Sequence, residues 1–228
     1  PWMPEWGIHW FVGIDGISLL LVVLTTFLVP IVLVASWNDV AKSLRSYVFF
    51  MLFLETGMLG AFVSLNLFQF YVFWELMLIP SYFLIKLWGG GAERHYAALK
   101  FVLYTLLGSV FMLVGIALLD INYHQWALLH HTDQTYSFDL LDLLRVPIPV
   151  SQQLVIFWLM FLGFAFKAPV FPFHTWLPDA LLEGPIGMAV VLAGLKLGTF
   201  GFIRFSIPLL PDASKSETVV MVVVGLGL

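Results

Sequence analysis

The stretch that decides the fold of this 228-residue chain reads DGISLLLVVLTTFLVPIVLVAS and covers residues 15–36. After Asp15 it holds no charged residue, and its apolar positions are continuous rather than alternating. A helix needs about 20 such residues to cross the hydrocarbon core of a bilayer, whereas a membrane strand alternates apolar and polar positions. Residues 15–36 are therefore expected to form a transmembrane helix.

Five further segments are also predominantly apolar and long enough, or nearly so, to cross a bilayer. They cover residues 47–65, 67–88, 97–119, 152–168 and 186–209. Asn66 leaves almost no loop between the second and third segments, so these are expected to form a tight helical hairpin. A shorter apolar run covers 219–228. We expect one all-α polytopic membrane domain over 1–228, with about six full transmembrane helices and a partial one. Because the chain begins at Pro1 and stops within an apolar run, we interpret it as an internal fragment of a longer protein.

Composition excludes several classes of protein. The chain is 61% hydrophobic and 11% charged, with a mean hydropathy of +0.98. A soluble domain has about 45–50% apolar and about 25% charged residues. The net charge of -4, without a cluster of basic residues, argues against nucleic-acid binding. The absence of cysteine excludes disulfides, cysteine-held metal or iron–sulfur sites and cysteine nucleophiles.

The basic residues of the loops predict the orientation in the membrane. One set of loops carries more of them than the other, namely Lys42, Arg45, Lys86, Arg94 and Lys100 against Arg145 and Lys215. The richer set is expected in the cytoplasm. The loop 120–150 then faces outward, and the helical spacing of apolar residues in 138–145 predicts a short helix on the membrane surface.

Ionisable residues inside the expected spans are the candidate functional residues, because each costs about 2.5–3.5 kcal/mol on insertion scales. Glu75 lies within the 67–88 segment, and no basic residue stands three or four positions away on that segment. Its partner is expected on another helix. The alternative is a neutral carboxyl that hydrogen-bonds to a neighbouring backbone.

Lys167 ends an apolar segment that continues as Ala168-Pro169-Val170-Phe171-Pro172. Two prolines three residues apart cannot both lie in an intact helix, since each lacks an N–H and clashes with the preceding turn. Pro169 and Pro172 therefore predict a helix break whose unpaired carbonyls suit an ammonium group. Such breaks at membrane depth line wet cavities or are buried in protein. The alternative is a lysine that extends to the membrane interface.

Lys196 lies ten residues into the 186–209 segment, near the middle of the membrane. From there its side chain cannot reach the interface, so an exchangeable proton is the better interpretation. Gly194, Gly198 and Gly201 would let other helices approach closely.

Three further residues are secondary candidates. Glu55, with Gly57 and Gly60 nearby, is either a relay group or a neutral packed acid. Lys100 is interpreted mainly as a lysine that extends to the interface. His174 follows the expected break and is either a proton carrier or a cap of the broken helix.

An acid and two lysines on three membrane helices indicate proton transfer. An anion beside a lysine holds the lysine's proton, and moving that anion by a few ångström releases it. Against 100 mV, each proton moved costs about 2.3 kcal/mol. The energy must come from elsewhere, because the chain has no nucleotide or redox motif.

The stretches FWELMLIPSYFLI (73–85), FKAPVFPFHTWLPDA (166–180) and KLGTFGFIRF (196–205) closely resemble the antiporter-like subunits of respiratory complex I, with the first stretch closest to the M type. The resemblance implies a fragment of a 14-helix antiporter-like fold, with residues 15–119 holding four helices and 152–209 the broken helix and the Lys196 helix. It maps the family's glutamate–lysine pair to Glu75 and Lys167, and the central lysine to Lys196.

The function that the resemblance implies is a proton-translocating subunit of NADH–quinone oxidoreductase in the bacterial inner membrane. Its partners would be other membrane subunits, including neighbouring antiporter-like chains. The chain itself is expected to hold no cofactor, with FMN, iron–sulfur clusters, NADH and quinone in partner subunits. The alternative within the superfamily is an Mrp-type cation/proton antiporter or a membrane-bound hydrogenase subunit.

Two alternatives come from other classes of protein. A haem- or quinone-binding subunit needs paired histidines on facing helices, but only His95 and His174 lie near the spans, both at their ends. A purely structural subunit does not explain a lysine at mid-membrane.

Overall fold

The computed structural model describes residues 2–40, 43–194 and 197–227, and in these ranges it contains helices and isolated β-bridges but no strand. The helices are η1 Pro4–Trp6, α1 Gly16–Ala35, α2 Leu44–Val63, α3 Leu67–Leu76, α4 Leu78–Trp88, α5 Arg94–Leu129, α6 Leu140–Leu143, α7 Val150–Lys167, α8 Trp176–Glu183, α9 Ile186–Gly194, α10 Leu197–Gly201, the π-helical segment η2 Phe202–Ser206, α11 Ile207–Leu209, α12 Pro211–Lys215 and α13 Glu217–Gly225.

Six helical stretches of the described chain are long and apolar enough to cross a membrane, which confirms the expected fold class. They are Gly16–Ala35, Leu44–Val63, Leu67–Trp88, Arg94–Leu129, Val150–Lys167 and Ile186–Leu209. The third of these stretches combines α3 and α4, and the sixth combines α9 to α11. Asn66 caps α3 directly after α2, as the expected hairpin requires.

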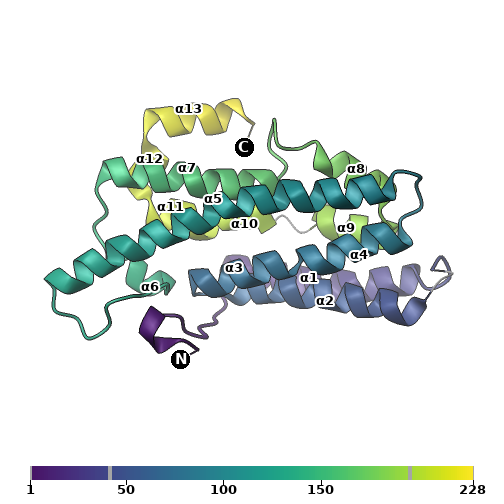
Figure 1. The fold of residues 1–228 in the computed structure, drawn as a ribbon, viewed down its shortest axis with the longest axis horizontal. Coiled ribbons are helices and arrows are strands. Elements are labelled where there is room, and N and C mark those ends of the chain that lie inside the picture. Colours follow the sequence, from purple (N-terminus) through teal and green to yellow (C-terminus); the bar gives the residue numbers. More distant parts are fainter. Residues whose placement is uncertain (1, 41–42, 195–196, 228) are drawn as a thin grey trace.

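The spanning helices run roughly along the long axis of the molecule (Figure 1). Helices α1 to α4 pack together, α5 packs along α7, and α10 packs against α7. An aromatic core joins these groups: the Phe164 ring of α7 contacts the rings of Phe70 and Trp74 on α3, and the Phe70 and Phe205 ring centroids are 4.7 Å apart. The helices that carry Glu75 and Lys167 are therefore held against each other by buried aromatic side chains.

Glycines allow the closest contacts between helices. A Cβ atom at Gly163 of α7 would lie 2.5 Å from the Cβ of Met112 on α5, and one at Gly57 of α2 would lie 2.6 Å from the Cγ of Met77. Small residues at such crossings are typical of membrane helices, whose association depends on close packing.

The loop between α5 and α7 is shorter than the sequence predicts. Helix α5 continues to Leu129, ten residues beyond the expected end at residue 119, and the predicted surface helix is the single turn α6. Asp120, Asn122 and His124 lower the local hydropathy, but polar residues do not prevent a helix from continuing. At 1.5 Å per residue α5 is about 54 Å long and exceeds the ~30 Å hydrocarbon core.

Asp15 caps α1. Its Oδ1 accepts hydrogen bonds from the backbone N–H groups of Ile17 and Ser18, at 3.2 and 2.8 Å. Its other oxygen forms an ion pair with Arg204 of η2. This ion pair links the start of the first spanning helix to the last one.

A polar network ties the loop between α5 and α7 to the α2–α3 hairpin. Asn66 Nδ2 donates to Asp139 Oδ1 at 2.7 Å, and His9 Nδ1 lies 3.0 Å from Asp139 Oδ2. The Ser137 hydroxyl donates to Asp142, while the Ser137 N–H donates to Asp120 of α5. We call these groups the Asp139 network.

Candidate functional site

Helix α7 ends at Lys167, two residues before Pro169, and the chain becomes helical again at Trp176. The carbonyls freed at this break have partners from later in the chain. The N–H of Val170 donates to the carbonyl of Ala165 at 2.9 Å, and Trp176 Nε1 donates to the carbonyl of Phe166 at 2.7 Å. The break is thus a defined turn with satisfied backbone groups, and Lys167 stands at its start.

The Glu75 helix is also interrupted, where one continuous helix over 67–88 was expected. Helix α3 ends at Leu76 and α4 begins at Leu78. Pro80 supplies the physical reason, because it has no N–H for the carbonyl of Leu76 and its ring crowds that carbonyl. Carbonyls in the last turn of α3 therefore lack their usual helical partners.

Lys167 binds at this second interruption. Its Nζ donates to the carbonyl of Trp74 at 3.0 Å and lies 4.2 Å from the centroid of the Trp74 ring. The carbonyl therefore belongs to a neighbouring helix, whereas the sequence interpretation placed the ammonium at the carbonyls of its own broken helix. The backbone dipole and the ring face both favour a cation at this point.

Glu75 directly follows Trp74 and interacts electrostatically with Lys167, but their charged atoms are not within 4.0 Å of each other in the described part of the chain. Glu75 Oε1 is buried and has no hydrogen-bond partner. Ser109 of α5 lies next to this carboxyl. The acid and the lysine are therefore neighbours without a direct ion pair.

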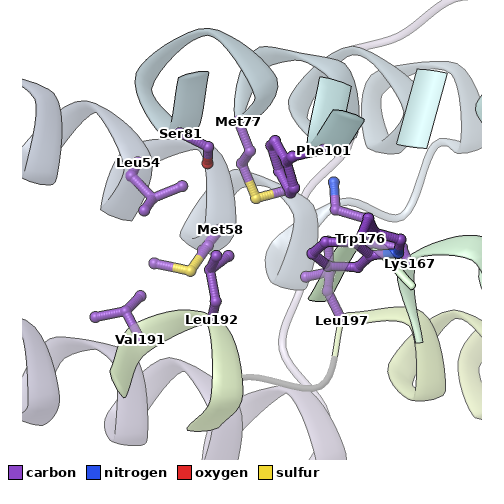
Figure 2. A pocket seen from close by; sticks show the side chains of 10 residues that line it. All are labelled: Leu54, Met58, Met77, Ser81, Phe101, Lys167, Trp176, Val191, Leu192 and Leu197. Carbon is purple, nitrogen blue, oxygen red and sulfur yellow. The ribbon is translucent and has the colours of Figure 1, made fainter. Parts of the chain in front are cut away.

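A cavity of about 40 Å³ adjoins Lys167 where α2, α4, α5, α7, α8, α9 and α10 meet (Figure 2). It is lined by Leu54, Met58, Met77, Ser81, Phe101, Lys167, Trp176, Val191, Leu192 and Leu197. A site needs about 10–15 Å³ of such volume to hold one water, so this cavity has room for a few. We call Glu75, Lys167, Ser81 and this cavity the Lys167 centre.

Lys196 lies outside the described residues. The residues that follow it, Leu197 and Gly198, are described and lie at the Lys167 centre. Leu197 lines the cavity, and a Cβ atom at Gly198 would lie 2.7 Å from the backbone nitrogen of Ala168. The segment after Lys196 thus packs directly against the residue that follows Lys167.

The secondary candidates lie apart from the cavity lining. Lys100 forms an ion pair with Asp179 of α8 at 2.7 Å and lies near the rings of Tyr96 and Tyr104. In the described residues Glu55 has no hydrogen-bond or ion-pair partner. His174 Nδ1 is buried without a partner, in the turn between α7 and α8.

Sequence reasoning missed three features of this site. Ser81 was not recognised as a candidate residue, although a hydroxyl beside a proline in an apolar segment is a usable signal. Asp179, the partner of Lys100, was also visible only as part of a motif. The carbonyl of Trp74 has no side-chain signal at all, because every residue type carries a backbone carbonyl.

A helical bundle with two proline-interrupted spans and buried ionisable groups at the interruptions is typical of polytopic membrane proteins. Residues 64–228 match the family described as "NADH:quinone oxidoreductase/Mrp antiporter, TM". Residues 2–61 match "NADH-ubiquinone oxidoreductase chain 4, amino terminus". The chain belongs to the NADH:quinone oxidoreductase/Mrp antiporter family.

Curated relatives share the sequence over nearly the whole chain. NADH-quinone oxidoreductase subunit M of Rickettsia conorii is 43% identical over 223 residues, which are 97% of this chain and 43% of the relative. NADH-ubiquinone oxidoreductase chain 4 of Arabidopsis thaliana is 41% identical over 219 residues, which are 95% of this chain and 42% of the relative. The chain thus spans less than half the length of these relatives.

Solved structures share the fold. A chain of respiratory complex I from Thermus thermophilus has a TM-score of 0.76 at 35% identity, covering 93% of this chain and 43% of that one. A chain of the Mrp complex from Dietzia sp. has a TM-score of 0.78 at 23% identity, covering 93% of this chain and 23% of that one. The second likeness is one of fold alone.

Proposed function

We propose that this chain is part of a proton-translocating membrane subunit of NADH–quinone oxidoreductase, in which Glu75, Lys167 and Lys196 relay the proton. The observation that carries the proposal is the position of Lys167: its ammonium lies between two interrupted helices, next to an acid and to a cavity of about 40 Å³. A lysine held only for packing needs neither an adjacent acid nor room for water.

The charges of the site support a switch in which Glu75 controls the proton of Lys167. When Glu75 is ionised, its field favours the ammonium form of Lys167. When the anion is neutralised or moves away, the ammonium gives up its proton more readily. The two groups are neighbours without a direct ion pair, so Glu75 acts on the ammonium through its electric field.

Lys196 receives the proton in this scheme. Its assignment rests on its place in the sequence and on the resemblance to the family. The packing of Gly198 against Ala168 and the place of Leu197 in the cavity wall support a short transfer. Glu55, Lys100 and His174 are proposed as secondary relay groups, with Lys100 the weakest of them because Asp179 already pairs with it.

The energy for transport comes from redox chemistry in other subunits under this proposal. FMN, iron–sulfur clusters, NADH and quinone belong to those partners, and neighbouring antiporter-like chains complete the membrane arm. The bacterial relatives and the multiple spans support a place in the bacterial inner membrane.

The Mrp-type antiporter or membrane-bound hydrogenase subunit is the alternative within the family. The family description covers both transporters and oxidoreductases, and the fold likeness to the Mrp complex is as high as that to complex I. Sequence favours complex I, because identity to complex I chains is 35–43% and to the Mrp chain 23%.

Purification of the complete native membrane complex distinguishes an NADH–quinone oxidoreductase subunit from an antiporter or hydrogenase subunit. We expect flavin, iron–sulfur absorption and NADH-driven quinone reduction in the complex that contains this chain. A complex of hydrophobic chains without these would refute the oxidoreductase proposal and favour the antiporter. Lys196→Ala tests the relay: we expect loss of proton pumping at normal complex assembly.

A further inference from the structure

Ser81 of α4 is fully buried, and its hydroxyl has no hydrogen-bond partner. Several other hydroxyls in the spanning helices donate to the carbonyl one turn earlier. Thr25 donates to Leu21 at 2.6 Å, and Thr105 donates to Phe101 at 2.7 Å. This local bond is the ordinary way to satisfy a hydroxyl in a membrane helix. Ser81 does not form it.

The unpartnered hydroxyl belongs to the cavity beside Lys167. Ser81 and Lys167 line this space together, and most of the other lining residues are aliphatic, sulfur-containing or aromatic (Figure 2). A purely apolar cavity of this size stays dry, whereas a water with two or more polar partners is stable. Ser81 and Lys167 supply such partners, and about 40 Å³ holds about three waters.

We propose that the Ser81 hydroxyl holds an ordered water in this cavity and that this water takes up the proton that leaves Lys167. This inference rests on the proposed function, because it assigns the carrier between two groups of the same relay. Ser81 is a positioning residue here: it neither gains nor loses a net proton.

The transfer conserves every proton. The Lys167 ammonium gives one proton to the first water and becomes a neutral amine. That water passes one of its own protons to the next water, and the last water gives one to the acceptor that we assign as Lys196. The acceptor gains one positive charge, and each water ends with its original composition and a changed orientation.

A matched control exists within the same chain. Ser206 of η2 is also buried, and its hydroxyl also lacks a partner, but it does not line this cavity. Loss of an unpartnered buried hydroxyl should have the same small effect on packing at either position. A difference in transport between the two positions would therefore come from the cavity.

The test uses the complete complex reconstituted in sealed vesicles. The two measured quantities are the rate of proton pumping and the solvent deuterium isotope effect on that rate. Ser81→Ala should slow pumping about three- to tenfold, the equivalent of one lost hydrogen bond, and should enlarge the isotope effect. Ser81→Thr keeps a hydroxyl, so its pumping rate and isotope effect should equal those of the parent. Ser206→Ala should also leave both quantities unchanged. Ser81→Cys, of similar volume and with a weaker donor, should fall between Ser81→Ala and the parent.

Normal pumping with an unchanged isotope effect in assembled Ser81→Ala would overturn the inference. If this variant does not assemble, normal pumping by assembled Ser81→Cys would overturn it equally. Failure of the proposed function gives a different pattern, in which Lys167→Met and Lys196→Ala also pump normally. If those two variants stop pumping while the Ser81 variants do not, only the role of Ser81 is refuted.

Discussion

The Asp139 network and the Lys167 centre both gather polar side chains, and they differ in how completely those groups are paired. Asn66, Asp139 and Ser137 all have hydrogen-bond partners, which join the loop between α5 and α7 to the helices. At the Lys167 centre, Glu75 Oε1 and the Ser81 hydroxyl have none. A buried polar group without a partner costs about 1–3 kcal/mol. Folding therefore explains the first group of residues, whereas the unpaired groups of the second add nothing to stability and are free to interact with water or protons.

Replacing Lys167 should have the largest effect. Lys167→Met keeps the length and packing of the side chain but removes the proton, so we expect proton pumping to fall by about 100-fold or more. Pumping by sealed vesicles, normalised to assembled complex, measures this. If the variant pumped at more than half the parent level, Lys167 would not belong to the proton pathway. The Lys167 centre and the Asp139 network would then no longer differ in function.

Glu75→Gln should have the next largest effect on transport. The amide has the same shape as the carboxyl but cannot provide the negative charge, so the control over the Lys167 proton is lost. We expect pumping to fall about tenfold, equivalent to about 1.4 kcal/mol. Glu217→Gln, at an exposed position on α13, is the matched control and should pump normally. Equal pumping by the two variants would contradict the proposed role of Glu75.

Asp139→Ala tests the other side of the comparison. The change removes the contacts of Asp139 with Asn66 and His9, so stability should fall by about 2–3 kcal/mol. We expect a lower midpoint of thermal unfolding for the complex and normal pumping per assembled complex. Impaired pumping at normal stability would show that the network belongs to the transport machinery.

Asp15→Asn should have the smallest effect. Asparagine caps a helix about as well as aspartate, so only the ion pair with the Arg204 guanidinium is lost. The Asp15 side chain is 39% exposed, and such pairs contribute about 0–1 kcal/mol. A loss of stability larger than that of Asp139→Ala would show that the link between the first and last spans matters more than the loop network.

The sequence was sufficient to predict the spans, because continuous apolar segments leave one fold class in a bilayer. It also predicted where α7 ends, because Pro169 lacks an N–H and clashes with the turn that precedes it. It did not predict that Pro80 interrupts the Glu75 helix, because a single proline does not always end a helix, as Pro30 inside α1 shows. Nor did it predict that α5 continues to Leu129, because polar residues do not prevent a helix from continuing.

The pairing of residues across helices was predictable only in part. Glu75 and Lys167 were expected to be neighbours on different helices, and they are. The partners Lys100 with Asp179 and Asp15 with Arg204 were not expected, because they are separated by 79 and 189 positions and depend on helix packing. The cavity depends on the fit of many side chains, which no local pattern encodes.

The acceptor that holds Lys167 is a main-chain atom, and this has a consequence for sequence variation. Any amino acid at position 74 offers the same oxygen, so this contact can persist unnoticed while the side chain there drifts. What distinguishes the position is the break between α3 and α4, next to which Pro80 leaves the carbonyl of Leu76 without a helical donor. Sequence changes that restored a continuous helix here would compete with the lysine for its oxygen without altering the lysine itself.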